Sequence, residues 1–160
     1  MEAGQRCPVV FMYYIILAVL IAADQLIKIL VRNTKEIGES IPIFGDIFKL
    51  TYIENEGMAF GMMAGKSMFL TVVPIIFLVI IFVLWKKYGH KYTSLVDISV
   101  TMVLAGGISN IFDRICFGSV TDYLNLKGFA IFNFADICAT VGCVLLCIGI
   151  CFFEKRNNYE

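Results

Sequence analysis

Four long stretches of the chain are almost free of charged residues, and polar residues gather at their ends. The stretches are Val9–Ala23 (continuing to Val31 across three polar residues), Ser67–Trp85, Ile98–Phe112 and Ile137–Phe153. A helix needs roughly 20 apolar residues to cross a bilayer, with a lower limit of about 17. The second and fourth stretches are long enough alone, and the others qualify once their polar ends are counted. The pattern predicts four membrane-spanning helices, at about residues 8–31, 67–88, 95–113 and 134–153.

Composition supports a membrane protein. Of the 160 residues, 59% are hydrophobic and only 16% are charged, and the mean hydropathy is +0.83. A soluble domain is usually nearer half apolar and a quarter charged. The alternative, a soluble protein with a buried helical core, fits this composition less well. We therefore expect an all-α integral membrane protein, with residues 1–160 forming a single polytopic domain.

The distribution of basic residues predicts the orientation. The formal net charge is zero, so no general basic field favours nucleic acid as a partner. Four crossings place the two termini and the turn after the second helix on one side. That side carries Arg6, Lys86, Lys87, Lys91, Lys155 and Arg156. Because basic residues prefer the cytoplasmic side, both termini are expected to be cytoplasmic.

The long connection at residues 32–66 has turn formers around short apolar runs, and residues 47–53 have the composition of a strand. We expect a small extracytoplasmic β-sheet within this first outer loop. The same topology places the polar residues near the helix ends on the outer side. They are Asp24, Gln25, Lys28, Asn55, Asn110, Asp113, Arg114, Asp122, Asn133 and Asp136.

Most of these polar residues also have purely structural interpretations. Asp24 and Lys28 have the spacing and order of a helical salt bridge. Asn110, Asp113 and Arg114 share one helix face and suggest a polar network. Gly106, Gly107 and Ser109 are small enough to allow close approach of a neighbouring helix.

Asn133 and Asp136 could serve as the N-cap and a first-turn acid of the last helix. Capping does not account for Asp122, which a short outer connection keeps near the same surface. Ionisable groups at the edge of hydrocarbon are costly and suggest a functional site. Two carboxylates that meet there suggest acid–base chemistry.

The sequence predicts no metal site and no cofactor. Three of the six cysteines, Cys143, Cys147 and Cys151, recur on one face of the last helix, where Cys usually acts as a small hydrophobe. A single His and the absence of a Cys-x-x-Cys pair are too little for a common zinc site.

Five short strings resemble the bacterial lipoprotein signal peptidase family (signal peptidase II), whose members are four-helix membrane aspartic proteases. They occur in family order as Asp24-Gln25-x-x-Lys28, Asn55-x-Gly57-x-Ala59-Phe60-Gly61, Asn110-x-x-Asp113-Arg114, Asp122-Tyr123 and Phe132-Asn133-x-Ala135-Asp136. Each string is weak alone, but five in order on one membrane face are specific. The chain differs at Ser109, Thr121 and Tyr123, where the family commonly has Gly, Val and Phe, and the stretch from Asp122 to Asp136 is somewhat short.

The resemblance implies that Asp122 and Asp136 are the catalytic pair. It implies supporting roles for Asp24, Lys28, Asn55, Gly57, Asn110, Asp113, Arg114, Asn133 and Ala135. It further implies a monomeric enzyme of the bacterial cytoplasmic membrane, in contact with membrane lipids and with its active site at the outer face. The implied substrates are diacylglyceryl-modified prolipoproteins, cleaved before the lipidated cysteine, and globomycin-type antibiotics are the implied inhibitors.

Two other classes of protein remain to be tested. In a non-enzymatic membrane scaffold, the acids would only cap helices and pair with Arg114 and Lys28. A small transporter would use a carboxylate proton relay and would need polar residues through the depth of the helices. The apolar middles of the second and fourth stretches argue against such a path.

Overall fold

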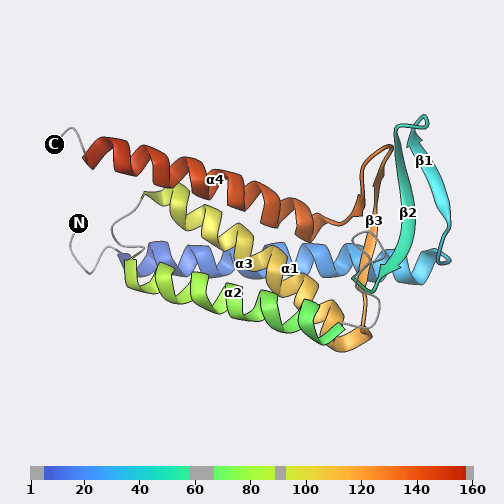
Figure 1. Cartoon of the computed structure of the whole chain (residues 1–160), viewed down its shortest axis with the longest axis horizontal. Coiled ribbons are helices and arrows are strands. Elements are labelled where there is room, and N and C mark those ends of the chain that lie inside the picture. The colour runs from blue at the N-terminus through green and yellow to red at the C-terminus, as the bar shows by residue number, and fades with distance from the viewer. Residues whose placement is uncertain (1–5, 58–66, 89–92, 158–160) are drawn as a thin grey trace.

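The computed structural model describes residues 6–57, 67–88 and 93–157. Four helices run side by side, and a small sheet covers one end of them (Figure 1). The elements in chain order are α1 (Arg6–Thr34), β1 (Ser40–Phe44), β2 (Phe48–Asn55), α2 (Ser67–Tyr88), α3 (Ser94–Phe117), β3 (Val120–Leu126), β4 (Ile131–Phe132) and α4 (Phe134–Asn157). The four helices are long and apolar enough to cross a membrane, which confirms the predicted class.

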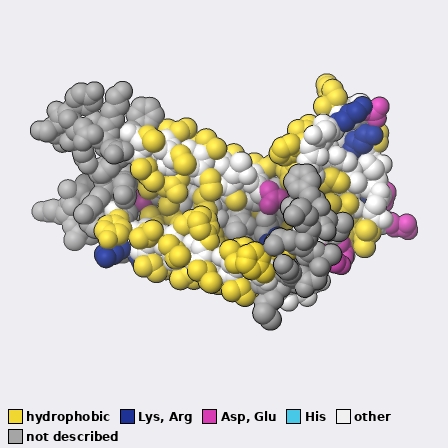
Figure 2. Space-filling view, viewed as in Figure 1, with side chains coloured by type: hydrophobic (Ala, Val, Ile, Leu, Met, Phe, Trp, Pro, Cys, Tyr) yellow, Lys and Arg dark blue, Asp and Glu magenta, His cyan; other side chains and the backbone are white. Residues whose placement is uncertain are grey.

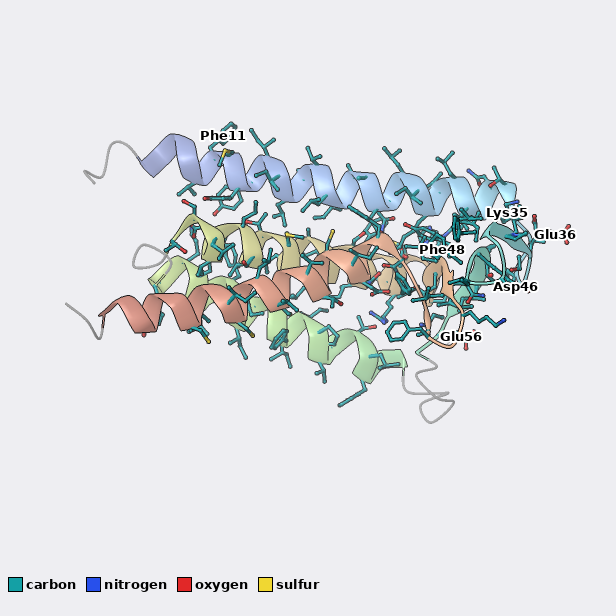
Figure 3. All side chains as sticks on the ribbon, turned by 90° about the horizontal axis from the view of Figure 1, so that it is seen from above. Phe11, Lys35, Glu36, Asp46, Phe48 and Glu56 are labelled. Atoms are coloured by element: carbon teal, nitrogen blue, oxygen red, sulfur yellow. The ribbon has the colours of Figure 1, made fainter. Side chains whose placement is uncertain are left out.

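The surface of the bundle differs from that of the sheet. Large hydrophobic side chains are exposed along α1, α2 and α4, and they cover much of the visible face of the helices (Figure 2). The charged residues Lys35, Glu36, Asp46 and Glu56 instead gather at the sheet end, whereas Phe11 lies toward the other end of α1 (Figure 3). Such a division suits helices in hydrocarbon and a sheet in a polar medium.

Helix α3 is the centre of the bundle, because it packs against each of the other three helices. Its apolar residues Val96, Val100, Val103 and Leu104 form the core with Leu78 of α2. Gly106 makes the contact with α4 possible: a Cβ atom there would lie 2.2 Å from the carbonyl oxygen of Ala135. The predicted close approach of a neighbouring helix is confirmed at this position.

The sheet is larger than the sequence suggested. Strands β1 and β2 confirm the expected strands of the first connection, and β3 and β4 of the second connection extend them into a four-stranded antiparallel sheet of order β1-β2-β3-β4. The sequence predicted only a short outer connection between the third and fourth helices, because the first residues of β3 carry no clear strand pattern. They are buried on both faces, so period-two alternation could not identify them. Asp122 therefore lies on a strand.

The ends of three helices also differ from those expected. Helix α1 extends to Thr34, α3 to Phe117 and α4 to Asn157, each beyond the point where hydrophobicity falls. Backbone hydrogen bonding, rather than hydropathy, decides where a helix ends. Helix α3 is capped at its C-terminus by Gly118, whose N–H donates to the carbonyl of Arg114.

We predict that Gly106→Ala lowers the stability of the folded protein by about 1–3 kcal/mol, because backbone atoms of α4 must move to admit the methyl group. Ala normally favours a helix over Gly, so destabilisation here would report the close contact. Thermal unfolding in detergent micelles measures the effect. Ala18→Val, which adds apolar bulk on an exposed part of α1, should change the unfolding temperature little. An unchanged stability of Gly106→Ala would contradict the contact.

Candidate functional site

The start of α4 is stabilised by a reciprocal capping arrangement. The side-chain oxygen of Asn133 accepts a hydrogen bond from the backbone N–H of Asp136 at 2.9 Å. In return, Oδ2 of Asp136 accepts from the backbone N–H of Asn133 at 3.1 Å. The capping interpretation is therefore confirmed. The cap leaves Oδ1 of Asp136 and the side-chain NH2 of Asn133 available for contacts with other elements.

Two other elements complete this cap. The backbone N–H of Ala135 donates to Oδ1 of Asp24 on α1 at 2.8 Å. The backbone N–H of Phe134 donates to the hydroxyl oxygen of Tyr123 on β3 at 3.2 Å. The first N–H groups of a helix have no partner within the helix. Here they join α1, β3 and α4 at one point.

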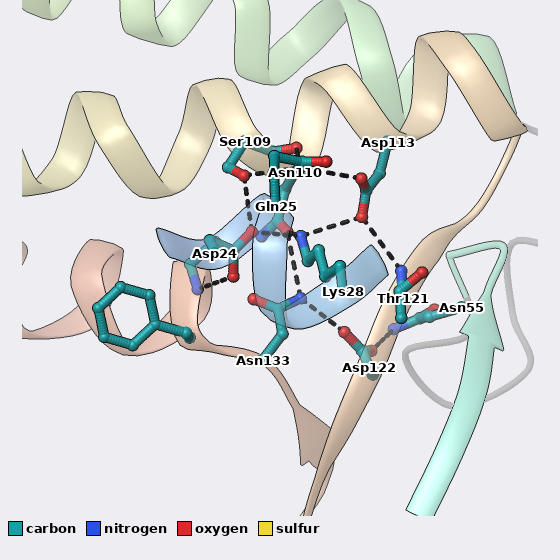
Figure 4. A network of polar contacts seen from close by, with 12 residues as sticks. Asp24, Gln25, Lys28, Asn55, Ser109, Asn110, Asp113, Thr121, Asp122 and Asn133 are labelled. Carbon is teal, nitrogen blue, oxygen red and sulfur yellow. Dashed lines mark hydrogen bonds and ion pairs between the residues drawn. The ribbon is translucent and has the colours of Figure 1, made fainter. Parts of the chain in front are cut away.

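Lys28 lies beneath the cap, with 0% of its side chain exposed. Its ammonium group is 2.8 Å from Asp24 Oδ2 and 3.0 Å from Asp113 Oδ2. It also donates to Oδ1 of Asn110 at 2.9 Å. The predicted salt bridge between Asp24 and Lys28 is therefore present, as part of a larger network that joins α1 to α3 (Figure 4). A buried charge needs this degree of compensation.

Four residues that we had not assigned to the site belong to this network. Gln25 donates to Asp113 Oδ1 at 3.0 Å and to the Ser109 hydroxyl at 2.8 Å. Ser109 donates in turn to Asp24 Oδ2 at 2.6 Å. Arg32 and Thr121 also contact Asp113. A signal for Arg32 was present, since Asp24, Lys28 and Arg32 recur every four residues on one helix face.

The two acids singled out by the sequence are held by neighbouring amides. Asp122 is 2% exposed, and it accepts from Asn55 at 2.8 Å and from Asn133 at 2.7 Å. Asp136 accepts from Asn110 at 2.7 Å. Asn133 contacts both acids, Asp122 through its side-chain amide and Asp136 through its cap. One residue thus ties the two carboxylates into one site.

The electrostatics differ from those of an ordinary surface acid. Burial raises the pKa of Asp122 to about 6, and the nearby charge of Asp136 adds to the increase. Hydrogen bonds from Asn55 and Asn133 act in the opposite direction, because they stabilise the carboxylate form. The charges of Asp136, Asp122 and Asp113 all act on Arg114, which places a cation within electrostatic reach of the acids.

The turn after β2 positions Asn55. The backbone N–H of Gly57 donates to Oδ1 of Asn55 at 2.9 Å, which leaves the amide group of Asn55 directed to Asp122. Gly57 has φ +104°, and a Cβ atom there would overlap Leu70 of α2. Only glycine fits this backbone without strain.

The structure thus brings all eleven sequence-predicted site residues to the sheet end of the bundle.

Within the described residues, no group of three or more His, Cys, Asp or Glu side chains could hold a metal ion. The chemistry available to the described part of the site is that of carboxylates, amides and cations at one end of a membrane helix bundle.

These features define a polytopic membrane protein with two acids, Asp122 buried and Asp136 half-buried, tied together at one end of the bundle. Comparison with known proteins identifies the family: a model of signal peptidase (SPase) II matches residues 16–152. The chain belongs to the signal peptidase II family, a family of bacterial membrane peptidases.

Its relatives are similar over almost their whole length. A lipoprotein signal peptidase of Halothermothrix orenii is 37% identical over 92% of this chain and 100% of the relative. One from Fusobacterium nucleatum is 33% identical over 99% of this chain and 95% of the relative. A solved structure, described as a bacterial membrane enzyme, superposes with a TM-score of 0.79 at 26% identity and covers 93% of this chain and 92% of its own.

We predict that Lys28→Met lowers stability by about 3–5 kcal/mol, because Asp24 and Asp113 would lose the buried cation between them. Unfolding in detergent micelles measures the change. Lys35→Met is the matched control: it breaks the Lys35–Glu39 pair, which has the same i,i+4 spacing but lies just after α1 and is partly exposed. That loss should be about 1 kcal/mol or less. Equal losses in the two variants would contradict a special role for burial at Lys28.

Proposed function

We propose that this chain is an aspartic endopeptidase that removes the signal peptide from diacylglyceryl-modified prolipoproteins, cleaving before the lipidated cysteine. Asp122 and Asp136 are the catalytic pair. The observation that carries the proposal is the arrangement of these two acids around Asn133, with Arg114 within electrostatic reach. The names of the full-length relatives support the substrate class.

In the proposed mechanism the two carboxylates share one proton, because like charges at close range disfavour double ionisation. Asp122 holds the proton, since it is the more deeply buried acid and its pKa is raised. Asp136, as carboxylate, takes a proton from water while the water oxygen bonds to the scissile carbonyl carbon. Asp122 donates its proton to the carbonyl oxygen.

Collapse of the tetrahedral intermediate completes the cleavage. The C–N bond breaks, the proton on Asp136 passes to the leaving nitrogen of the cysteine, and a proton from the intermediate returns to Asp122. The products are the carboxyl end of the signal peptide and the free amine of the lipidated cysteine. The dyad therefore ends in its starting protonation state.

The position of the site at one end of apolar helices suits such a substrate. The diacylglyceryl chains can stay in lipid beside the bundle while the peptide bond reaches the carboxylates. In the proposed orientation, the end with both termini is cytoplasmic and the sheet end is extracytoplasmic, following the distribution of basic residues. The proposed enzyme acts as a monomer, and globomycin-type compounds are its inhibitors.

We predict that Asp122→Asn and Asp136→Asn each reduce cleavage of a diacylglyceryl-modified precursor by at least about 10²-fold, because each variant lacks one proton-transferring group. Asp46→Asn is the control, since Asp46 is an exposed acid in the turn between β1 and β2, where it pairs with Lys49. Purified variants in detergent micelles, with and without globomycin, are assayed by the mobility shift of the processed product. Full activity in both dyad variants, with the protein folded, would overturn the assignment of Asp122 and Asp136, whereas no cleavage by the unaltered chain would instead support a scaffold or a transporter.

We also predict that kcat/KM falls as pH rises above about 6, because the protonated form of Asp122 is lost as pH passes its pKa. Asn55→Ala removes a hydrogen bond that lowers this pKa, so the decline should move to higher pH. A pH profile of precursor cleavage measures both. Asn125→Ala, which removes a contact with Thr51 elsewhere on β3, should leave the decline in place. Movement to lower pH in Asn55→Ala would contradict the assignment of the proton to Asp122.

A further inference from the structure

Arg32 lies in the last turn of α1. It contacts α3 and also β3, the strand that carries Asp122. One terminal nitrogen of its guanidinium lies 3.0 Å from Asp113 Oδ1 of α3. Its Nε donates to the hydroxyl oxygen of Thr121 on β3 at 2.6 Å. The guanidinium carbon lies over the ring of Phe117, 3.8 Å from the ring centroid. A single side chain therefore joins three elements.

Thr121 passes this contact on to Asp122. Successive side chains of a strand point to opposite faces, so Thr121 meets Arg32 on one face and Asp122 meets Asn55 and Asn133 on the other. The backbone N–H of Thr121 also donates to Asp113 Oδ2 at 3.2 Å. The residue before Asp122 is thus held through both its backbone and its side chain. Thr121 is fully buried, so water does not compete for its hydroxyl.

The chemistry of arginine is needed for this combination of contacts. Its planar group offers donors in fixed directions and a face that stacks on an aromatic ring. A lysine could pair with Asp113 but could not also donate from Nε to Thr121 and cover Phe117. Asp113 also has Lys28 and Gln25 as partners, and these contacts do not involve Arg32. The need to neutralise Asp113 therefore does not by itself explain why an arginine stands at position 32.

We infer that Arg32 is a positioning residue: it fixes the start of β3 through Thr121 and so sets the direction of the Asp122 carboxylate. The inference rests on the proposed function, in which Asp122 transfers a proton to the scissile carbonyl. A shift of about 1 Å in a catalytic group can reduce a rate by up to about 10²-fold. The contact between Arg32 and Thr121 affects the rate of the chemical step and leaves binding of the lipidated precursor unchanged.

The experiment measures kcat and KM for a diacylglyceryl-modified precursor peptide with the full chain in detergent micelles, per mole of folded protein. Arg32→Met should lower kcat by about tenfold and leave KM within about twofold. Thr121→Val should also lower kcat. The double variant should lose no more than Arg32→Met alone, because the two residues act through one contact. Arg32→Lys should retain stability better than Arg32→Met but should not restore kcat.

Thr34→Val is the matched control, because the Thr34 hydroxyl lies at the same end of α1 but donates to the carbonyl of Leu30 within its own helix. It should keep the kcat of the unaltered chain. The inference is overturned by an unchanged kcat in Arg32→Met, by an equal loss in Thr34→Val, or by full recovery in Arg32→Lys. Asp122→Asn is assayed in parallel: if it is fully active, the proposed function itself fails, whereas an inactive Asp122→Asn with a fully active Arg32→Met overturns only the role of Arg32.

Discussion

The structure depends on a lysine ammonium group that has no access to water. Lys28 is compensated by two carboxylates, Asp24 and Asp113, from two different helices. Desolvation of an ion costs several kcal/mol and is offset only when the partners are well placed. The positions of α1 and α3 at the sheet end are therefore restricted to those that keep these contacts. In lipid, where helices gain little from hydrophobic association, such contacts specify how the helices meet.

The same constraint extends to the start of α4 and to the acids above it. Asp24 also accepts from the backbone of Ala135, so the helix that carries Asp136 begins where the buried charges are satisfied. Asn110 accepts from Lys28 and donates to Asp136. The network is thus continuous from a structural ion pair to the proposed catalytic acid. A residue can be structural in this site and still determine the chemistry.

Three positions show how this chain strengthens the network. Ser109, Thr121 and Tyr123 each carry a hydroxyl, and they are the positions where the resemblance leads us to expect Gly, Val and Phe in the family. The Ser109 hydroxyl donates to Asp24, that of Thr121 accepts from Arg32, and that of Tyr123 accepts from the backbone of Phe134. Asp24 and Arg32 are far in sequence from the hydroxyls that they contact. Phe134 is nearer to Tyr123, across the β3–β4 turn. The departures are therefore explained by contacts between elements.

The sequence alone determined the four helices and the gathering of polar residues at one end, because hydrocarbon length and the cost of charge in lipid act locally along a chain. It also singled out Asp122 and Asp136 as candidates through short strings that resemble those of a known family. Only the tertiary structure decided that Asp122 lies on a strand of a four-stranded sheet, that Asn133 contacts both acids, and that Gln25, Arg32, Ser109 and Thr121 join the site. The physical reason is that strand pairing and hydrogen bonds between elements depend on which residues come into contact in space. Local hydropathy does not contain that information.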